Sequence, residues 1–125
     1  MTTETTGSRL ERDSLGTLPV PRDALWGIHT QRALENFPIS GLPLGRHRHL
    51  VHALAHVKKA AALTNTDLGL IPARVGAAIA AACDTILRGE AYDAFPVDVV
   101  QGGAGTSTNM NANEVIANLA LLGLG

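Results

Sequence analysis

Apolar residues recur every three or four positions in two long stretches of the chain. The first stripe begins at Leu50 and predicts a helix over 46–68. The second begins at Val75 and predicts a helix over 73–87, with Pro72 in a first-turn position that helices tolerate. Because the connection between the two is short, they are expected to pack antiparallel as a helical hairpin.

Weaker patterns predict the remaining elements. A short helix is expected over 28–36, where Phe37 and Pro38 end it, and another is expected over 109–122. Leucines interspersed with charges over 9–20 make a short strand or hairpin an option there. The polar residues 1–8 are expected to form a disordered tail. The sequence therefore predicts one mainly α domain over 9–125, with short helices, a helical hairpin and little or no strand.

The composition limits the size of the core that this domain can form. Of the 125 residues, 46% are hydrophobic but only 3% are aromatic, and much of the apolar content is alanine. Alanine favours helix but buries little area per residue. An isolated chain is therefore expected to have a thin core and to depend on partners for stability.

Charge and cysteine content argue against several classes of protein. The formal net charge of −1 provides no electrostatic basis for binding nucleic acid or an anionic membrane surface. The sequence contains no run of 18 apolar residues, and its polar start lacks the apolar segment of a signal peptide. Cys83 has no second cysteine to pair with and is expected to be a small buried hydrophobe. These features favour a cytoplasmic protein without nucleic-acid or membrane partners.

The stretch 95–114 carries the candidate chemistry. A β-branched run that favours an extended path leads into a glycine-rich turn over 102–105, and hydroxyl and amide side chains follow where a helix begins. Three hydroxyl residues are candidates for the helix cap, namely Thr106, Ser107 and Thr108. Asn111 together with Glu114 resembles a variant of the capping box.

A helix start with unpaired N–H groups and clustered hydroxyls can bind a carboxylate or a phosphate. The glycines would let such an anion approach the backbone closely. The alternative interpretation is a capped helix behind a glycine turn, with no ligand. Two cofactor motifs do not match: Thr108 stands where a dinucleotide fingerprint needs its third glycine, and no lysine follows the glycines as a P-loop requires.

Residues 101–118, from Gln101 through the run Gly-Gly-Ala-Gly-Thr-Ser-Thr-Asn-Met-Asn, resemble the N-terminal motif of aspartate ammonia-lyases in the aspartase/fumarase superfamily. Two further segments, 20–37 and 57–62, match the same family in order and spacing. Fumarases are similar, but they typically carry Thr-Gly-Ser-Gly-Thr-Gln where residues 102–107 read Gly-Gly-Ala-Gly-Thr-Ser. The resemblance is therefore closer to the aspartase branch.

The resemblance implies the N-terminal domain of the aspartase/fumarase fold and the reversible elimination of ammonia from L-aspartate to give fumarate. It implies that Thr106 contacts a carboxylate of this small dicarboxylate, with Ser107 and Asn109 as weaker candidates. Gly105 would let Thr106 approach the substrate. The resemblance implies no cofactor and no metal, and it implies a homotetramer as the intact assembly.

The chain also departs from the family. Members are several times longer, and their central helical bundle and C-terminal domain have no counterpart here. Their general-base serine lies in a Gly-Ser-Ser-x-Met-Pro-x-Lys-x-Asn-Pro loop that this sequence lacks, as it lacks their substrate-binding Thr-His pair. No catalytic residue is therefore assigned, and the chain is expected to be inactive alone. It is either the N-terminal part of an aspartase, a fumarase-type fragment, or a non-catalytic module that binds a dicarboxylate or docks onto lyase subunits.

A row of histidines lies on the predicted 46–68 helix. His49, His52 and His56 share one face, and imidazoles one turn apart can converge on zinc. However, no carboxylate or thiol accompanies them. A solvated or subunit-facing row is the favoured interpretation, and no metal site is predicted.

Overall fold

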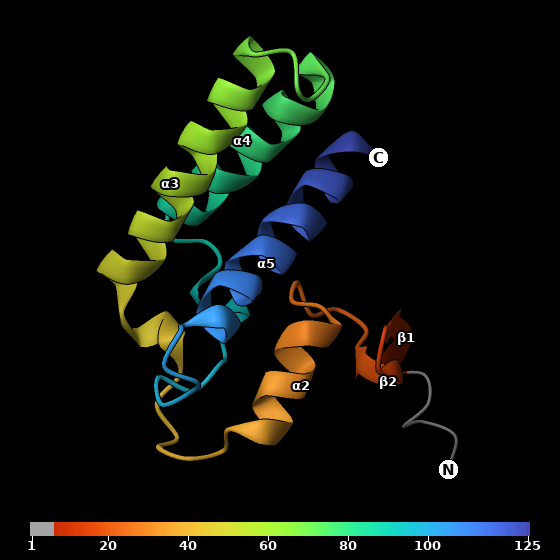
Figure 1. Cartoon of the computed structure of the whole chain (residues 1–125), viewed down its shortest axis with the longest axis vertical. Coiled ribbons are helices and arrows are strands. Elements are labelled where there is room, and N and C mark those ends of the chain that lie inside the picture. Colours follow the sequence, from red (N-terminus) through yellow and green to blue (C-terminus); the bar gives the residue numbers. More distant parts are fainter. Residues whose placement is uncertain (1–6) are drawn as a thin grey trace.

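A computed structural model describes residues 7–125 of the chain (Figure 1). The elements in chain order are β1 (Ser8–Asp13), β2 (Gly16–Pro21), α2 (Ile28–Asn36), the 3-10 helix η1 (Leu44–Arg46), α3 (Arg48–Asp67), α4 (Ala73–Leu87), the 3-10 helix η2 (Tyr92–Ala94) and α5 (Thr106–Leu124). The three long helices α3, α4 and α5 lie side by side, and α2 packs beside α5 next to the β1–β2 hairpin (Figure 1). The prediction of a mainly α fold with a helical hairpin and little strand is confirmed.

Local patterns placed most helix boundaries well. The predicted helices over 28–36 and 73–87 coincide with α2 and α4. The helix predicted over 46–68 begins two residues later, at Arg48, because His47 leaves helical geometry with φ −91° and ψ 74° after the 3-10 turn. The helix predicted over 109–122 is longer at both ends, and α5 begins at Thr106.

The N-terminal strands form an antiparallel hairpin, as the pattern over 9–20 allowed. Its register pairs Ser8 with Pro21 and Asp13 with Gly16. The disordered tail predicted over 1–8 falls mostly outside the described residues, but its last residue, Ser8, is the first residue of β1. The hairpin therefore begins one residue before the boundary that the sequence predicted.

The core lies between α3, α4 and α5 and is closed by the segment that leads to the glycine turn. Its largest fully buried side chain is Phe95, and Val97 and Cys83 are also buried. Burial, followed by the nearby Asp84 charge, raises the pKa of the Cys83 thiol to about 11, so Cys83 is an inert small hydrophobe as predicted. Many of the other core residues are alanines, as the composition indicated. None of the helices within residues 7–125 is long and apolar enough to cross a bilayer.

The Asp98 carboxylate joins the extended run before the glycine turn to the loop that follows α2. It accepts hydrogen bonds from the backbone N–H groups of Ser40 (2.8 Å), Gly41 (2.9 Å) and Val100 (2.8 Å) and from the Ser40 hydroxyl (2.7 Å). The Ser40 hydroxyl first, and then these backbone donors, lower the pKa of Asp98 well below its usual range. The carboxylate is therefore a charged clamp that holds two loops together.

Asp98→Asn is expected to reduce the loss of unfolding free energy that the chain shows on acidification. Because folding lowers the pKa of Asp98, its charged form stabilises the fold above the ordinary aspartate value of about 3.9, and this contribution is lost as pH falls below that value. Denaturant unfolding of both proteins between about pH 3 and pH 6 checks this. The fall in unfolding free energy on acidification should be shallower in Asp98→Asn, and equal slopes would contradict the clamp.

Candidate functional site

The glycine turn ends in a left-handed residue that starts α5. Gly105 is the N-cap, with φ 72° and ψ 18°, and its N–H donates to the carbonyl of Gly102 at 3.0 Å. A residue without Cβ takes this conformation at little cost, but it has no side chain with which to cap. The predicted hydroxyl cap from 106–108 is therefore wrong. Instead the Gln101 side chain accepts the N–H of Thr108 at 2.9 Å.

Two backbone donors at the start of α5 have no acceptor within residues 7–125. These are the N–H groups of Thr106 and Ser107, which lie in the first turn, where helices lack internal partners. Thr106 is exposed, whereas Ser107 is buried, with 8% of its surface accessible. The hydroxyl of Thr106 is therefore not packed away among apolar side chains. The start of α5 offers hydroxyls and bare amides together.

These groups open onto a cavity of about 590 Å³. One wall is the glycine turn with Thr106 and Ser107, and the other walls come from α2 and the tip of the hairpin. The tip of the hairpin contributes Asp13, Ser14 and Leu15. The segment of α2 and the residue after it contribute His29, Arg32, Ala33, Asn36 and Phe37. The tertiary fold thus adds cationic and imidazole groups to the donors that the sequence predicted.

Not every predicted site residue faces this cavity. Gly105 forms the turn behind Thr106 without lining the cavity itself. Asn109 is exposed, and its side-chain oxygen accepts a hydrogen bond from Nζ of Lys58 on α3 at 2.6 Å. A role for Asn109 in substrate binding stays a prediction.

An ion pair fixes the hairpin tip beside the cavity. Arg32 on α2 donates from Nε and Nη2 to the two carboxylate oxygens of Asp13, each at 2.8 Å, and Nη2 also reaches the carbonyl of Gly16 at 3.2 Å. The Arg32 hydrogen bond lowers the pKa of Asp13, and the same bond raises the pKa of Arg32. Both groups are therefore charged at neutral pH, and the two charges largely offset each other in the cavity wall.

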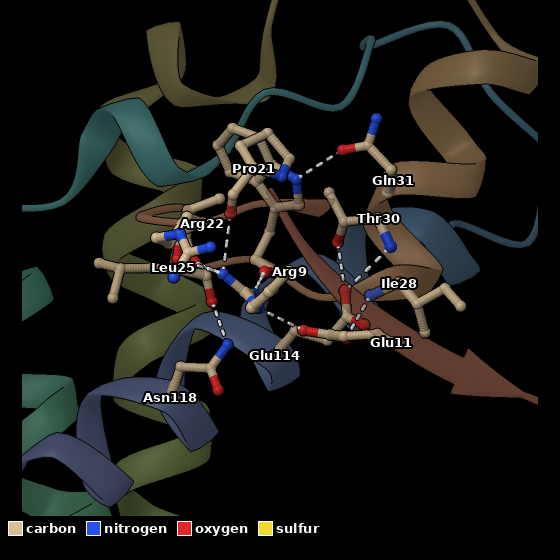
Figure 2. A network of polar contacts seen from close by, with 12 residues as sticks. Arg9, Glu11, Pro21, Arg22, Leu25, Ile28, Thr30, Gln31, Glu114 and Asn118 are labelled. Carbon is tan, nitrogen blue, oxygen red and sulfur yellow. Dashed lines mark hydrogen bonds and ion pairs between the residues drawn. The ribbon is translucent and has the colours of Figure 1, made fainter. Parts of the chain in front are cut away.

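Two distant carboxylates cap the start of α2, which has no side-chain cap of its own (Figure 2). Glu11 on β1 accepts the N–H of Ile28 at 2.9 Å. Glu114 on α5 accepts the N–H groups of His29 and Thr30, each at 2.9 Å, and the Thr30 hydroxyl at 2.6 Å. Negative groups are favourable at a helix N-terminus. Glu114 thus ties the helix that carries His29 to the helix that carries the candidate anion site.

This arrangement overturns the predicted capping box of Asn111 with Glu114. Asn111 is fully buried and donates to the carbonyl of Ala94 at 2.9 Å. Glu114 points instead to α2, where a Cβ on Gly27 would come within 2.5 Å of its Oε2 atom. Local spacing could not reveal this partner, because 84 and 85 positions separate Glu114 from Thr30 and His29 in the chain.

Arg9 organises the segment between the hairpin and α2 (Figure 2). Its guanidinium donates to the carbonyls of Pro21 at 2.9 Å, Ala24 at 2.8 Å and Trp26 at 2.6 Å, and its Nε donates to Glu11 at 2.8 Å. A planar group with several donors suits this set of acceptors. The result is a rigid support for the start of α2.

The histidine row on α3 does not converge on one point. His52 Nε2 lies 2.7 Å from the hydroxyl of Tyr92, and the two rings stack. Within the described part of the chain, no group of three or more histidine, cysteine, aspartate or glutamate residues could hold a metal ion.

The amino-acid sequence of this chain is similar to those of known lyases. The model of a family described as "Lyase" matches residues 16–124. The aspartate ammonia-lyase of Pseudomonas aeruginosa is 58% identical over 118 residues, which are 94% of this chain and 25% of that protein. The class II fumarate hydratase of Halobacterium salinarum is 61% identical over 112 residues, 90% of this chain and 23% of that protein.

A solved structure agrees with these relatives. The native fumarate lyase:delta crystallin of Brucella melitensis superposes with a TM-score of 0.92 at 57% identity, covering 94% of this chain and 27% of that one. The chain thus spans about a quarter of the length of the curated relatives that it matches. It belongs to the lyase family of the aspartase/fumarase superfamily and corresponds to the N-terminal region of that fold.

Proposed function

We propose that this chain supplies the substrate-carboxylate-binding loop of a lyase that reversibly eliminates ammonia from L-aspartate to give fumarate. The observation that carries the proposal is the pair of unpaired N–H groups at Thr106 and Ser107, which lie with their hydroxyls at the wall of the 590 Å³ cavity. The 58% identity to an aspartate ammonia-lyase supports the reaction.

The chemistry explains why such donors are needed. Removing a proton next to a carboxylate places a second negative charge on that carboxylate, and this charge must be stabilised as it develops. Hydroxyl and backbone N–H donors held by a helix start and a rigid turn can do this without reorganising. The Arg32–Asp13 pair adds little net charge, so the donors of Thr106 and Ser107 carry the stabilisation.

The proposal assigns no general base to this chain, which is therefore inactive alone. The complete enzyme is a cytoplasmic homotetramer in this proposal. Large apolar residues that the fold leaves exposed support an assembly, notably at the end of α5, where Leu121 and Leu122 are 62% and 72% exposed.

A fumarase-type hydratase is the second candidate. The 61% identity to a class II fumarate hydratase favours it, and both reactions build negative charge on a carboxylate of a small diacid. A carboxylate-binding loop alone does not distinguish an ammonium from a hydroxyl leaving group. Residues outside this chain would make that distinction.

Two chimeras test the proposal. This chain replaces the matching segment of the Pseudomonas aeruginosa aspartate ammonia-lyase in one, and of the Halobacterium salinarum fumarate hydratase in the other. We expect the first chimera to produce fumarate from L-aspartate, which ultraviolet absorbance measures. The fraction of host activity that it retains should be higher than the fraction that the second chimera retains with L-malate. Activity in the second alone would favour the hydratase, and two folded but inactive chimeras would contradict both assignments.

A further inference from the structure

We propose that His29 is a second ligand-contacting residue of this cavity, which donates a hydrogen bond from Nε2 to a carboxylate oxygen of the bound diacid. The inference rests on the proposed function, because it takes the diacid as the ligand. It adds a contact from α2, whereas Thr106 and Ser107 contribute from α5.

The first observation is the state of the imidazole ring. His29 is partly buried, lines the cavity, and makes no side-chain hydrogen bond to any residue within 7–125. Its Nδ1 atom is buried and has no hydrogen-bond partner in the described part of the chain. Most buried polar atoms in proteins have a partner, so a free imidazole in a cavity wall is unusual.

The burial of Nδ1 determines which nitrogen can act. A ligand in the cavity cannot reach Nδ1, so Nε2 is the only nitrogen of this ring that can contact it. A proton on Nδ1 would create a buried donor without an acceptor, which is costly. The neutral ring is therefore expected to carry its proton on Nε2, where it can donate to an anion.

The second observation is how firmly this residue is held. The backbone N–H of His29 donates to Glu114 Oε2 at 2.9 Å, and the neighbouring N–H groups of Ile28 and Thr30 are bound by Glu11 and Glu114. Glu114 lies on α5, two turns after Thr106, so one helix sets the position of both cavity walls. A ligand contact needs this kind of support.

The charged groups around the ring leave room for an anionic ligand. On α2, Arg32 lines the same cavity but is paired with Asp13 from the hairpin. The carboxylates of Glu114 and Glu11 accept hydrogen bonds from backbone N–H groups at the start of α2. Each of these three carboxylates thus has its own donors, and within residues 7–125 none of them is hydrogen-bonded to the imidazole.

Two substitutions of His29 test which ring nitrogen, Nδ1 or Nε2, contacts the ligand. The amide nitrogen of glutamine lies about where Nε2 does, whereas that of asparagine lies nearer the position of Nδ1. In the active chimera, His29→Asn should raise KM for the diacid by about 10- to 100-fold, the value of a hydrogen bond to a charged group. His29→Gln should raise it much less, while both variants unfold at similar denaturant concentrations.

Nitrogen NMR of the histidine side chains in the chimera supplies a readout that needs no enzyme activity. The neutral His29 ring should show the Nε2–H tautomer, and added succinate should shift its Nε2 resonance in the chimera. An Nδ1–H tautomer, or equal KM values for the two variants, would overturn the inference. An inactive wild-type chimera would count against the proposed function instead, and the tautomer would still decide whether Nε2 is the donor.

Discussion

Thr106→Val is expected to lower kcat of the aspartase chimera by about 100- to 1000-fold, the usual effect of removing one donor to a developing oxyanion. Valine keeps the shape of threonine but removes the hydroxyl that lies at the cavity wall. Because the charge on the carboxylate grows in the transition state, kcat should fall more than KM rises. Initial rates of fumarate formation over a range of L-aspartate concentrations measure both constants.

Thr108→Val is the matched control for this prediction. It makes the same chemical change two residues away, at a side chain outside the cavity lining, and it keeps the backbone N–H that Gln101 binds. We expect near wild-type rates from it. If Thr106→Val and Thr108→Val have the same kcat, the hydroxyl of Thr106 does not stabilise the reaction, and the site assignment fails.

Gly45→Ala is expected to lower the stability of the fold, although it adds only a methyl group. An added Cβ would collide with the backbone carbonyl oxygen of Tyr92 and lie 3.3 Å from that of Phe95. Both neighbours are main-chain atoms in the contact between η1 and η2, so neither can move aside as a flexible side chain could. Overpacking of this kind costs about 1–3 kcal/mol, occasionally more. Denaturant unfolding monitored by circular dichroism measures the loss.

Gly103→Ala separates this collision from the general effect of replacing glycine. An added Cβ on Gly103 meets no atom of residues 7–125 within 4 Å, and Gly103 does not adopt a positive φ. Its substitution should leave the free energy of unfolding unchanged or raise it slightly, because alanine lowers the conformational entropy of the unfolded chain. Equal unfolding midpoints for Gly45→Ala and the unchanged chain would show that η1 and η2 are not this close in solution.

The sequence determined the parts of the fold that depend on local patterns. The period of an apolar stripe is a property of neighbouring residues, and so α4 was predicted with its observed boundaries; α2 was predicted with its observed boundaries because a proline marks its end. The glycine turn followed by hydroxyls was also visible as a candidate anion site, and Thr106 and Ser107 lie at a cavity. The family resemblance rested on the same local runs and is confirmed by the relatives.

Only the tertiary structure decided which groups share the site and how the helices begin. A helix start is capped by whichever carboxylate or amide oxygen lies close enough to accept its free N–H groups. That acceptor can come from a residue nearby in the sequence or from a distant one, so local spacing does not identify it. Glu114 therefore binds the start of α2 rather than α5, and Gln101 caps α5 in place of the expected hydroxyl. His29 and Arg32 reach the cavity only because α2 packs against α5, a contact between segments that no local periodicity encodes.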